Sequence, residues 1–285
     1  MRYFLGKLNE VIRIPELPEV ETIKNQIAPH LPLKVVSVVY SEVAGSIVKD
    51  KEFSPRGKVL ERVARKGKVL LFEFEGGLVS ISGLGMSGGW RVSETKVLEK
   101  HTHVQIKGLK ENGDTLFLAY VDPRRFGNLH HLKAEGAQKW LTRLGADVSS
   151  PEFTADYIWG RLQKCPQKEI KPFLLEQNHF AGVGNYMASE VCAHARILPS
   201  RRNHTLTKND ARNIEKAMKI VLEGTVKSGG TTFSGGYKDT TGNAGEGVKN
   251  LVVFYQQVCG LCDKSKVIKT VLKGRGTYHC PRCQN

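Results

Sequence analysis

The sequence predicts a multidomain protein of the α+β class, and three observations carry this prediction. Short apolar runs separated by glycine or charged residues fill residues 35–133, a pattern typical of the strands of a β-sandwich or barrel. After Leu144 the apolar residues recur at helical spacing instead. Four of the six cysteines form two close pairs near the C-terminus. With 285 residues, the chain is long enough for two ordinary domains.

A helix is expected at the start of the strand-rich half. Pro18 suits a first helical turn, and Glu19 and Glu21 suit the positive end of a helix dipole. Apolar residues then recur on one face, which predicts a helix from about Pro18 to Ala28. The clearest strand patterns follow it at residues 59–63, 69–74, 78–81, 104–106 and 116–121.

The second half carries signals for two helices and a long loop. Gly182-Val-Gly-Asn185 precedes an apolar helical pattern, so a helix N-terminus with free N–H groups for an anion is expected near Asn185. Thr207 and Asp210 have the spacing of a capping box, and the helix that they start should end at Gly229. Residues 231–247 are rich in Gly, Thr, Ser and Asn and are predicted to form a functional or mobile loop.

The charge of the chain points to a polyanionic partner. Lys and Arg number 43 against 28 Asp and Glu, which gives a net charge of +15. No apolar run approaches the roughly 18 residues of a membrane span, and the basic residues are spread along the chain and not gathered in one amphipathic helix. Nucleic acid is therefore the expected partner, and no membrane partner is expected. Residues 1–14 lack the apolar core and cleavage site of a secretory signal, so we do not expect secretion.

The paired cysteines are typical of a closed zinc site. Their spacing, with two residues inside each pair and 17 between the pairs, lets each turn offer two thiolates to one tetrahedral ion; the four ligands are Cys259, Cys262, Cys280 and Cys283. Two disulfides are the alternative, and a cytosolic chain disfavours them. Four protein ligands leave no open position, so one structural Zn²⁺ is predicted. The same segment is basic, and Arg275 lies between two glycines near a predicted hairpin tip, where it could reach a phosphate.

Two glycine-bearing turns could act on duplex DNA. Asp122-Pro-Arg-Arg-Phe-Gly127 places Arg124, Arg125 and Phe126 after a strand, so that a cation can enter a groove while a ring wedges into a base step. Met86 offers an apolar probe between Gly85 and Gly88. A structural turn in which Arg125 pairs with Asp122, and a core methionine, are the alternatives.

These motifs together resemble the formamidopyrimidine-DNA glycosylases. The resemblance runs from Pro15 to Asn285 and rests on six motifs in the same chain order, at residues 15–22, 66–71, 85–88, 122–127, 182–185 and 274–280. It implies an N-terminal β-sandwich, a helix-two-turns-helix domain and a zinc finger, with DNA in the cleft between the halves. The implied boundaries are an extension at 1–14, the sandwich at 15–134, a linker at 135–150, the helical domain at 151–232, a lesion-capping loop at 233–250 and the zinc finger at 251–285.

The resemblance also implies an activity. It suggests a bifunctional enzyme of base-excision repair that removes oxidised purines from double-stranded DNA and cuts the strand at the abasic site. We expect a monomer, since one cleft suffices for one lesion. Such an enzyme would lie in the bacterial cytoplasm and nucleoid, or in another DNA-containing compartment. The implied catalytic residues are Pro15 as nucleophile, Glu16 as acid/base and Lys68; those implied to contact DNA are Lys68, Met86, His103, Arg124, Arg125, Phe126, Asn185 and Arg275.

The sequence departs from the family at its nucleophile. Pro15 follows Ile14, so its nitrogen is an amide that cannot form an iminium ion. We therefore expect residues 1–14 to be absent from the active chain. A chain that keeps them would be a noncatalytic zinc-ribbon protein that binds DNA lesions. An endonuclease VIII-like enzyme for oxidised pyrimidines is a further alternative, which Leu17 and the Asp122–Gly127 motif disfavour.

Overall fold

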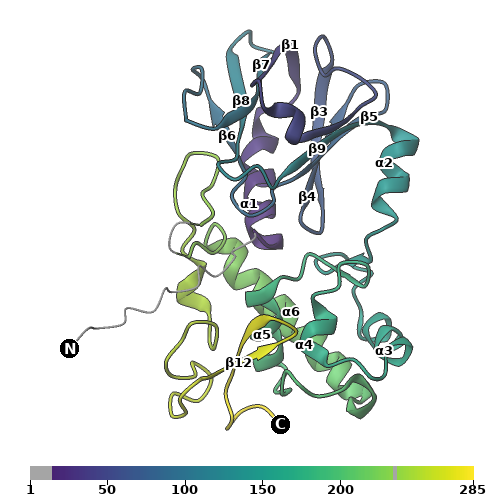
Figure 1. Ribbon diagram of the computed structural model, residues 1–285, viewed down its shortest axis with the longest axis vertical. Coiled ribbons are helices and arrows are strands. Elements are labelled where there is room, and N and C mark those ends of the chain that lie inside the picture. The colour runs from purple at the N-terminus through teal and green to yellow at the C-terminus, as the bar shows by residue number, and fades with distance from the viewer. Residues whose placement is uncertain (1–14, 234–235) are drawn as a thin grey trace, which may run out of the picture.

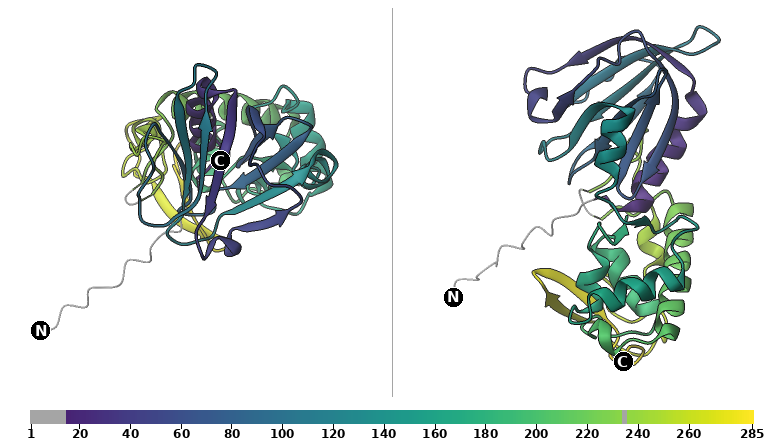
Figure 2. Two further views of the ribbon diagram at one scale, coloured as in Figure 1. Left: turned by 90° about the horizontal axis from the view of Figure 1, so that it is seen from above. Right: turned by 90° about the vertical axis from the view of Figure 1, so that its right-hand side faces the viewer.

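The chain folds into two lobes joined at a narrow waist (Figures 1 and 2). The computed structural model describes residues 15–233 and 236–285. One lobe holds the large sheet and the other holds most of the helices together with the C-terminal hairpin. The predicted division into a strand-rich and a helical half is therefore confirmed.

The first lobe is one nine-stranded sheet with the order β2-β9-β5-β4-β3-β1-β7-β8-β6. Its strands are β1 (Leu33–Tyr40), β2 (Val48–Lys51), β3 (Val59–Lys66), β4 (Val69–Phe74), β5 (Leu78–Gly83), β6 (Gly89–Ser93), β7 (Thr102–Leu109), β8 (Thr115–Val121) and β9 (Asn128–Lys133). Strands β4 and β6 are far apart in this order, yet the rings of Phe72 and Trp90 lie 4.7 Å apart. Trp90 also donates to Ser82 of β5 across 3.0 Å. The sheet therefore bends over a single core, as the predicted sandwich requires.

Two helices cover this sheet. Helix α1 (Leu17–Ile27) has Pro18 in its first turn, and a capping box between Glu16 and Glu19 closes this turn. Its apolar face, formed by Val20, Ile23 and Ile27, is fully buried in the sandwich core. Helix α2 (Ala134–Leu141) packs against β5 and β9. The observed start and end of α1 lie within one residue of the prediction.

The second lobe is built around a long amphipathic helix. Its helices are α3 (Ala155–Lys164), α4 (Ile170–Leu174), α5 (Asn185–His194) and α6 (Lys208–Lys227), and a short parallel pair joins β10 (Ala146–Asp147) to β11 (Phe180–Ala181). The capping box at Thr207 and Asp210 starts α6 as predicted, and α5 begins at Asn185 as predicted.

The C-terminal segment leaves α6 through a loop and ends in a hairpin. The described residues of 231–246 form neither helix nor strand, and a 3-10 turn (Gly247–Asn250) follows. Strands β12 (Ile268–Leu272) and β13 (Arg275–His279) pair through a two-residue turn, Lys273-Gly274, in which both residues have positive φ. Arg275 therefore lies beside the hairpin tip, as the sequence predicted. Within the described residues, no helix is both long and apolar enough to cross a membrane.

Candidate active site

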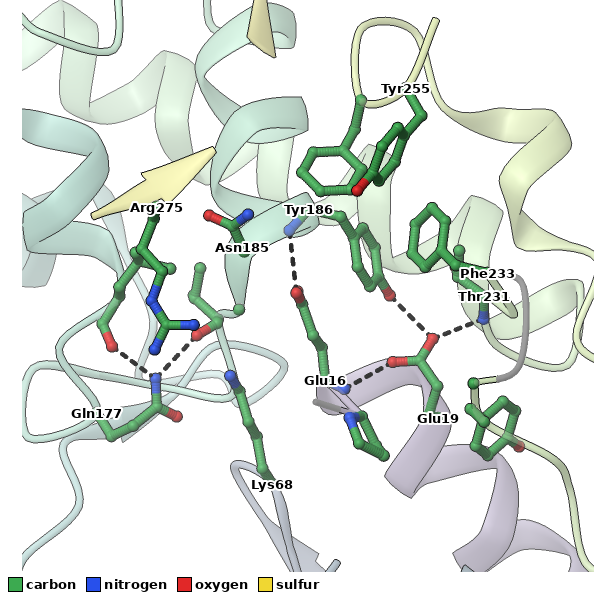
Figure 3. Close-up of a pocket in the computed structure, with 17 residues that line it drawn as sticks. Glu16, Glu19, Lys68, Gln177, Asn185, Tyr186, Thr231, Phe233, Tyr255 and Arg275 are labelled. Atoms are coloured by element: carbon green, nitrogen blue, oxygen red, sulfur yellow. Dashed lines mark hydrogen bonds between the residues drawn. The ribbon is translucent and has the colours of Figure 1, made fainter. Parts of the chain in front are cut away.

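A cavity of about 340 Å³ lies where the two lobes meet. Five of the predicted site residues line it, namely Pro15, Glu16, Lys68, Asn185 and Arg275. They come from the start of α1, the β3–β4 turn, the start of α5 and the start of β13 (Figure 3). The fold thus brings together residues up to 260 positions apart along the printed sequence.

The Glu16 carboxylate caps the N-terminus of α5. It accepts hydrogen bonds from the backbone N–H of Tyr186 at 3.0 Å and of Met187 at 3.1 Å. The sequence predicted an anion at this helix end, and the structure shows that a side chain of the same protein occupies it. Burial raises the pKa of Glu16, although Lys68 and these N–H groups act in the opposite direction.

The two glycines before α5 make room for this arrangement. A Cβ on Gly184 would lie 2.0 Å from Cδ of Glu16, and a Cβ on Gly182 would lie 2.5 Å from Cδ1 of Leu17. Gly182 also has a φ of +111°, which side-chain-bearing residues rarely adopt. The Gly-Val-Gly-Asn motif therefore lets α5 approach the start of α1 closely enough to hold Glu16.

Glu19 is a second buried carboxyl group of this cavity, and the sequence analysis treated it only as a helix-start residue. It accepts hydrogen bonds from Glu16 N at 2.7 Å, Tyr186 Oη at 3.0 Å and Thr231 N at 2.6 Å. Burial and the neighbouring Glu16 charge raise the pKa of Glu19 to about 8. Its spacing of three from Glu16 was the signal that could have predicted the capping box.

Lys68 projects from the β3–β4 turn toward these carboxyl groups (Figure 3). Burial lowers the pKa of Lys68, Glu16 and Glu19 raise it, and Arg275 lowers it further. Among the described residues, no hydrogen bond or ion pair holds its ammonium group. This ammonium group is therefore available to an incoming anion.

A buried lysine, Lys171, binds the two chain segments that carry Asn185 and Arg275. Its ammonium group donates to Asn185 Oδ1 at 2.7 Å, Gly276 O at 3.1 Å and Thr277 Oγ1 at 2.9 Å. Asn185 in turn donates to Gly276 O at 3.0 Å. Burial lowers the pKa of Lys171 to about 8. Lys171 thus ties the start of α5 to the hairpin that carries Arg275, and no motif in the sequence indicated this role.

Aromatic residues form the remaining wall. Tyr186, Phe233, Tyr237, Phe254 and Tyr255 all line the cavity. The Phe233 ring lies 5.9 Å from that of Tyr186 and 5.6 Å from that of Tyr255. Flat apolar walls next to a polar end suit a planar heterocycle attached to a charged backbone.

The loop after α6 forms part of this wall and also contacts the first lobe. Thr231 at its start bonds Glu19, and Gln26 of α1 donates to Asp239 Oδ2 at 2.9 Å. Thr240 N donates to Gln26 Oε1 at 3.0 Å, and Val92 N of β6 donates to Thr240 O at 3.0 Å. These contacts hold the loop across the cavity from α6 to the sandwich.

The two predicted wedge turns lie against each other. The Asp122 carboxylate accepts from Ser87 Oγ at 2.6 Å and from Gly127 N at 2.8 Å, which ties the Met86 turn to the Arg124–Phe126 turn. Gly85 must be glycine, because a Cβ there would lie 2.5 Å from the Phe126 carbonyl carbon. Phe126 is 53% exposed and stacks under the Arg124 guanidinium at 5.0 Å.

One residue of this region, His103, lies in a different setting from the expected one. His103 was expected at the surface but is only 4% exposed, because its ring bonds Ser41 Oγ at 3.0 Å and the Asp122 carbonyl at 3.0 Å. His103 therefore supports the Asp122–Gly127 turn from its buried side. Arg125 is exposed with a φ of +55°, and Asp122 bonds the backbone of this turn and not the Arg125 side chain. Met86 is half-buried.

The four paired cysteines converge as predicted. Their Sγ atoms all lie within 4.8 Å of one another, with 4.0 Å between Cys259 and Cys283 and 3.9 Å between Cys262 and Cys280. A tetrahedral zinc ion with bonds of about 2.3 Å needs sulfur atoms roughly 3.8 Å apart. The donor set therefore fits such an ion, and the four residues could hold it.

The chain combines a β-sandwich, a helix-two-turns-helix domain and a cluster of four cysteines, and its two lobes enclose one polar and aromatic cavity. This combination defines the class of DNA-repair glycosylases. Family models agree with this class. Residues 14–129 match the formamidopyrimidine-DNA glycosylase N-terminal domain, and residues 144–235 match the formamidopyrimidine-DNA glycosylase H2TH domain. The chain belongs to the formamidopyrimidine-DNA glycosylase family.

Individual relatives are similar over almost the whole chain. The formamidopyrimidine-DNA glycosylase of Syntrophomonas wolfei is 35% identical over 278 residues, which cover 95% of this chain and all of the relative. The crystal structure of the MutM (Fpg) protein from Thermus thermophilus has a TM-score of 0.81 at 32% identity and covers 95% of this chain and 98% of its own. Lactococcus lactis Fpg in complex with DNA containing N7-benzyl-Fapy-dG has a TM-score of 0.82 at 28% identity, with 95% and 100% covered.

Proposed function

We propose that this chain is a bifunctional DNA glycosylase and abasic-site lyase that excises oxidised purines, 8-oxoguanine and formamidopyrimidines, from double-stranded DNA. The observation that carries the proposal is the cavity in which Pro15, Glu16 and Lys68 meet. It supports a reaction that needs an amine, a buried acid and a cation around one sugar. Solved structures of Lactococcus lactis Fpg contain DNA with N7-benzyl-Fapy-dG and DNA with an oxidised pyrimidine, so these relatives support damaged DNA as the substrate. The purine class rests on Leu17 and the Asp122–Gly127 motif.

The nucleophile is the Pro15 nitrogen in a chain that begins at Pro15. An α-amino group with a pKa near 8 is roughly 10% unprotonated at pH 7, whereas an ordinary lysine is below about 0.1%. The free amine attacks C1′ of the damaged nucleotide, and the bond from C1′ to the base breaks with its electron pair leaving on the base. Glu16, held by α5, donates a proton to the sugar ring oxygen as the ring opens.

Strand cleavage follows from the charge on the adduct. A secondary amine gives an iminium ion, which takes up electrons when a proton leaves C2′ and the 3′ phosphate departs. A second elimination releases the 5′ phosphate, and water then hydrolyses the adduct to return Pro15. The Lys68 ammonium group, which no described side chain neutralises directly, stabilises the departing negative charge.

The remaining residues bind the duplex. Asn185 and Arg275 grip the phosphates beside the lesion, because Lys171 fixes both of their chain segments. Met86, Arg124 and Phe126 fill the space of the extruded base, since the exposed ring and cation share one pair of tied turns. The extruded base enters the aromatic part of the cavity under the 231–247 loop.

One structural Zn²⁺ held by the four cysteines would fix the hairpin that presents Arg275. The ion supplies folding energy and no reaction step, because its four protein ligands fill the coordination shell. Arg275 and the four sulfur atoms lie on the same C-terminal segment, so loss of the ion would release the phosphate contact.

Residues 1–14 lie outside the described residues, and their removal is part of the proposal. The family model begins at residue 14, directly before Pro15. Residue 14 is printed as Ile. Translation that starts at this codon, with a non-AUG codon read as Met, and removal of that methionine would free the Pro15 nitrogen, as would processing of a longer chain. Intact-mass measurement on protein from the native source tests this point, because a mass that includes residues 1–14 would contradict it.

The activity is tested with two versions of the chain. One carries an initiator Met directly before Pro15, which aminopeptidase removes, and the other starts at Met1. Each is incubated with a duplex that contains 8-oxoguanine and with an abasic duplex under borohydride. We expect strand cleavage and covalent trapping only from the version with a free Pro15. Equal trapping by both would exclude Pro15 as the nucleophile, and band shifts without cleavage by both would indicate a pure binding protein. Faster cleavage at oxidised pyrimidines would favour the endonuclease VIII-like alternative.

A further inference from the structure

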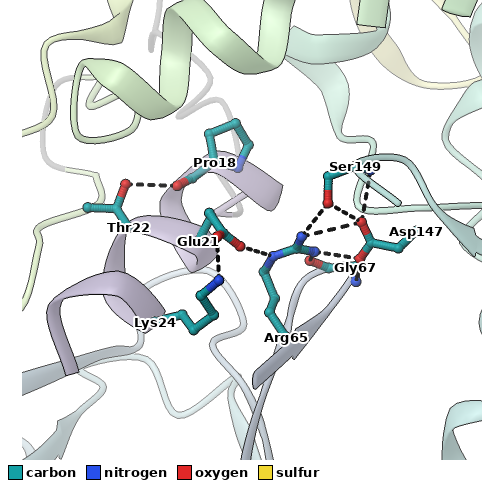
Figure 4. Close-up of polar contacts among 8 residues, drawn as sticks. All are labelled: Pro18, Glu21, Thr22, Lys24, Arg65, Gly67, Asp147 and Ser149. Carbon is teal, nitrogen blue, oxygen red and sulfur yellow. Dashed lines mark hydrogen bonds and ion pairs between the residues drawn. The ribbon is translucent and has the colours of Figure 1, made fainter. Parts of the chain in front are cut away.

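The turn that carries Lys68 is clamped to the helical lobe. Strands β3 and β4 pair up to Lys66 and Val69, so Gly67 and Lys68 form the turn between them. Gly67 N donates to Asp147 Oδ2 at 2.6 Å (Figure 4). Asp147 belongs to β10 of the other lobe, so this backbone hydrogen bond crosses the boundary between the lobes.

Arg65 completes the clamp. Its Nη1 donates to Gly67 O at 2.9 Å and lies 2.5 Å from Asp147 Oδ2. Its Nε donates to Glu21 of α1 at 2.7 Å, and its Nη2 donates to Ser149 Oγ at 2.7 Å. The Arg65 side chain is 5% exposed and that of Asp147 is 12% exposed. Three segments that are distant in sequence therefore converge on one buried guanidinium and the turn beside it.

The Asp147 carboxylate has every acceptor position in use. Besides Gly67 and Arg65 it accepts from Ser149 N at 2.9 Å and Ser149 Oγ at 2.6 Å. Burial acts to raise the pKa of Asp147, but Arg65, Ser149 and Gly67 outweigh it and hold the pKa below its usual value. The carboxylate is thus charged and rigidly oriented at neutral pH.

The clamp fixes Lys68 relative to Glu16. Strand β10 pairs with β11, and β11 leads through Gly182 and Gly184 to the helix end that binds Glu16. A Cβ on Gly67 would lie 3.1 Å from Gly182 N, so the turn already packs directly on this segment. Because no described group holds the Lys68 ammonium itself, its position depends on the turn.

We propose that Asp147, together with Arg65, is a positioning residue that places the Lys68 ammonium for the reaction by fixing its turn to the helical lobe. This inference rests on the proposed function, because it assigns Lys68 to that chemistry. Asp147 and Arg65 do not line the cavity, so they act on the substrate only through the turn. A displacement of about 1 Å in a catalytic group can cost about 100-fold in rate.

A double-mutant cycle tests the proposal with the chain that starts at Pro15. Single-turnover excision of 8-oxoguanine is measured for the unsubstituted chain, Asp147→Ala, Lys68→Ala and the double variant. We expect Asp147→Ala to slow excision by 10- to 100-fold, and to cause no further loss in the Lys68→Ala background. Arg62→Ala is the matched control, because Arg62 and Glu73 form an exposed ion pair across the same two strands, and it should stay within twofold of the unsubstituted rate.

Two additional readouts separate positioning from folding. Thermal unfolding reports whether Asp147→Ala remains folded. If it does not, Arg65→Lys replaces it in the cycle, because this change removes the guanidinium contacts to Gly67 O and Ser149 Oγ and keeps a positive charge beside Asp147 and Glu21. The pH profile of excision should shift in the Asp147 variants because Lys68 moves relative to Glu16. Equal losses from Asp147→Ala in both backgrounds, or no loss in either, would overturn the proposal. An unchanged rate for Lys68→Ala alone would instead refute the chemical role of Lys68.

Discussion

Replacement of Glu19 by glutamine should change how the stability of the protein depends on pH. Glu19 has a pKa of about 8 in the folded chain against 4.5 for an ordinary glutamate. Between these values the folded chain keeps a proton that the unfolded chain has lost, so its stability falls as pH rises. At about 1.4 kcal/mol for each pH unit, the whole effect amounts to about 5 kcal/mol, of which roughly 3 to 4 kcal/mol is lost between pH 5 and pH 8.

The assay is thermal unfolding of both chains at pH 5, 6, 7 and 8. For a protein of this size, roughly 2 to 4 °C accompanies each kcal/mol, so the unsubstituted chain should lose about 10 °C more than Glu19→Gln over this range. In Glu19→Gln the side-chain amide faces the Glu16 N–H, which lowers the free energy of unfolding by about 1 to 3 kcal/mol. This cost is the same at every pH, so it does not change how the slopes of stability against pH differ between the two chains.

Glu21→Gln is the control on the same helix. Lys24 and Arg65 lower the pKa of Glu21 against the effect of burial, so this variant should lose stability at neutral pH and lose less toward acidic pH. That change falls below about pH 4.5, the ordinary pKa of glutamate. Over pH 5 to 8 the Glu21→Gln curve should therefore run parallel to that of the unsubstituted chain, while the Glu19→Gln curve diverges from it. Parallel curves for Glu19→Gln and the unsubstituted chain would refute the assignment of a protonated carboxyl group to Glu19.

Four further outcomes are expected. Lys171→Met should lower the free energy of unfolding by about 3 kcal/mol and weaken DNA binding, because Asn185 Oδ1 and Thr277 Oγ1 lose their donor while Gly276 O keeps the Asn185 amide; denaturant titration measures the change in stability. Gly184→Ala should slow excision at least tenfold with DNA affinity retained, since its methyl group would displace Glu16, whereas Gly45→Ala, which meets nothing within 4 Å, should leave the rate unchanged. Arg275→Ala should flatten the salt dependence of DNA binding by about one phosphate contact, and an unchanged slope would contradict its role. Removal of zinc by a chelator should disorder the C-terminal hairpin and abolish tight DNA binding, which gel shifts and circular dichroism would follow.

Local signals predicted much of the fold. The capping box at Thr207 and the apolar periodicity after it lie within one segment, so they predicted α6 and its start. The spacing of the paired cysteines predicted that their four thiols converge, because each pair lies on one turn. Strands β1, β2, β6 and β9 of the large sheet were not among the predicted patterns. Of these, β2 is mostly exposed and β6 is only five residues long, so neither shows a clear apolar alternation.

The contacts that complete the site could not be predicted, because they join distant segments. Glu16 and Tyr186 are 170 residues apart, and Lys171 and Thr277 are 106 apart. A glutamate in a first helical turn and a lysine before a proline have ordinary solvent-exposed roles in most sequences. Only the packing of the two lobes buries them. The same packing explains why Asp147 gave no signal, although it accepts a hydrogen bond from the turn that carries Lys68.

The position of Glu16 has a consequence for how the protein is made. Glu16 is among the first residues of the domain to leave the ribosome, whereas the N–H groups that hold its carboxylate follow 170 residues later. At about 5 to 20 residues per second, roughly 10 to 30 seconds separate the two events. Until α5 emerges, the acid is an ordinary solvated glutamate with no cavity around it. The cavity around Glu16 therefore forms only when the helical lobe has been synthesised.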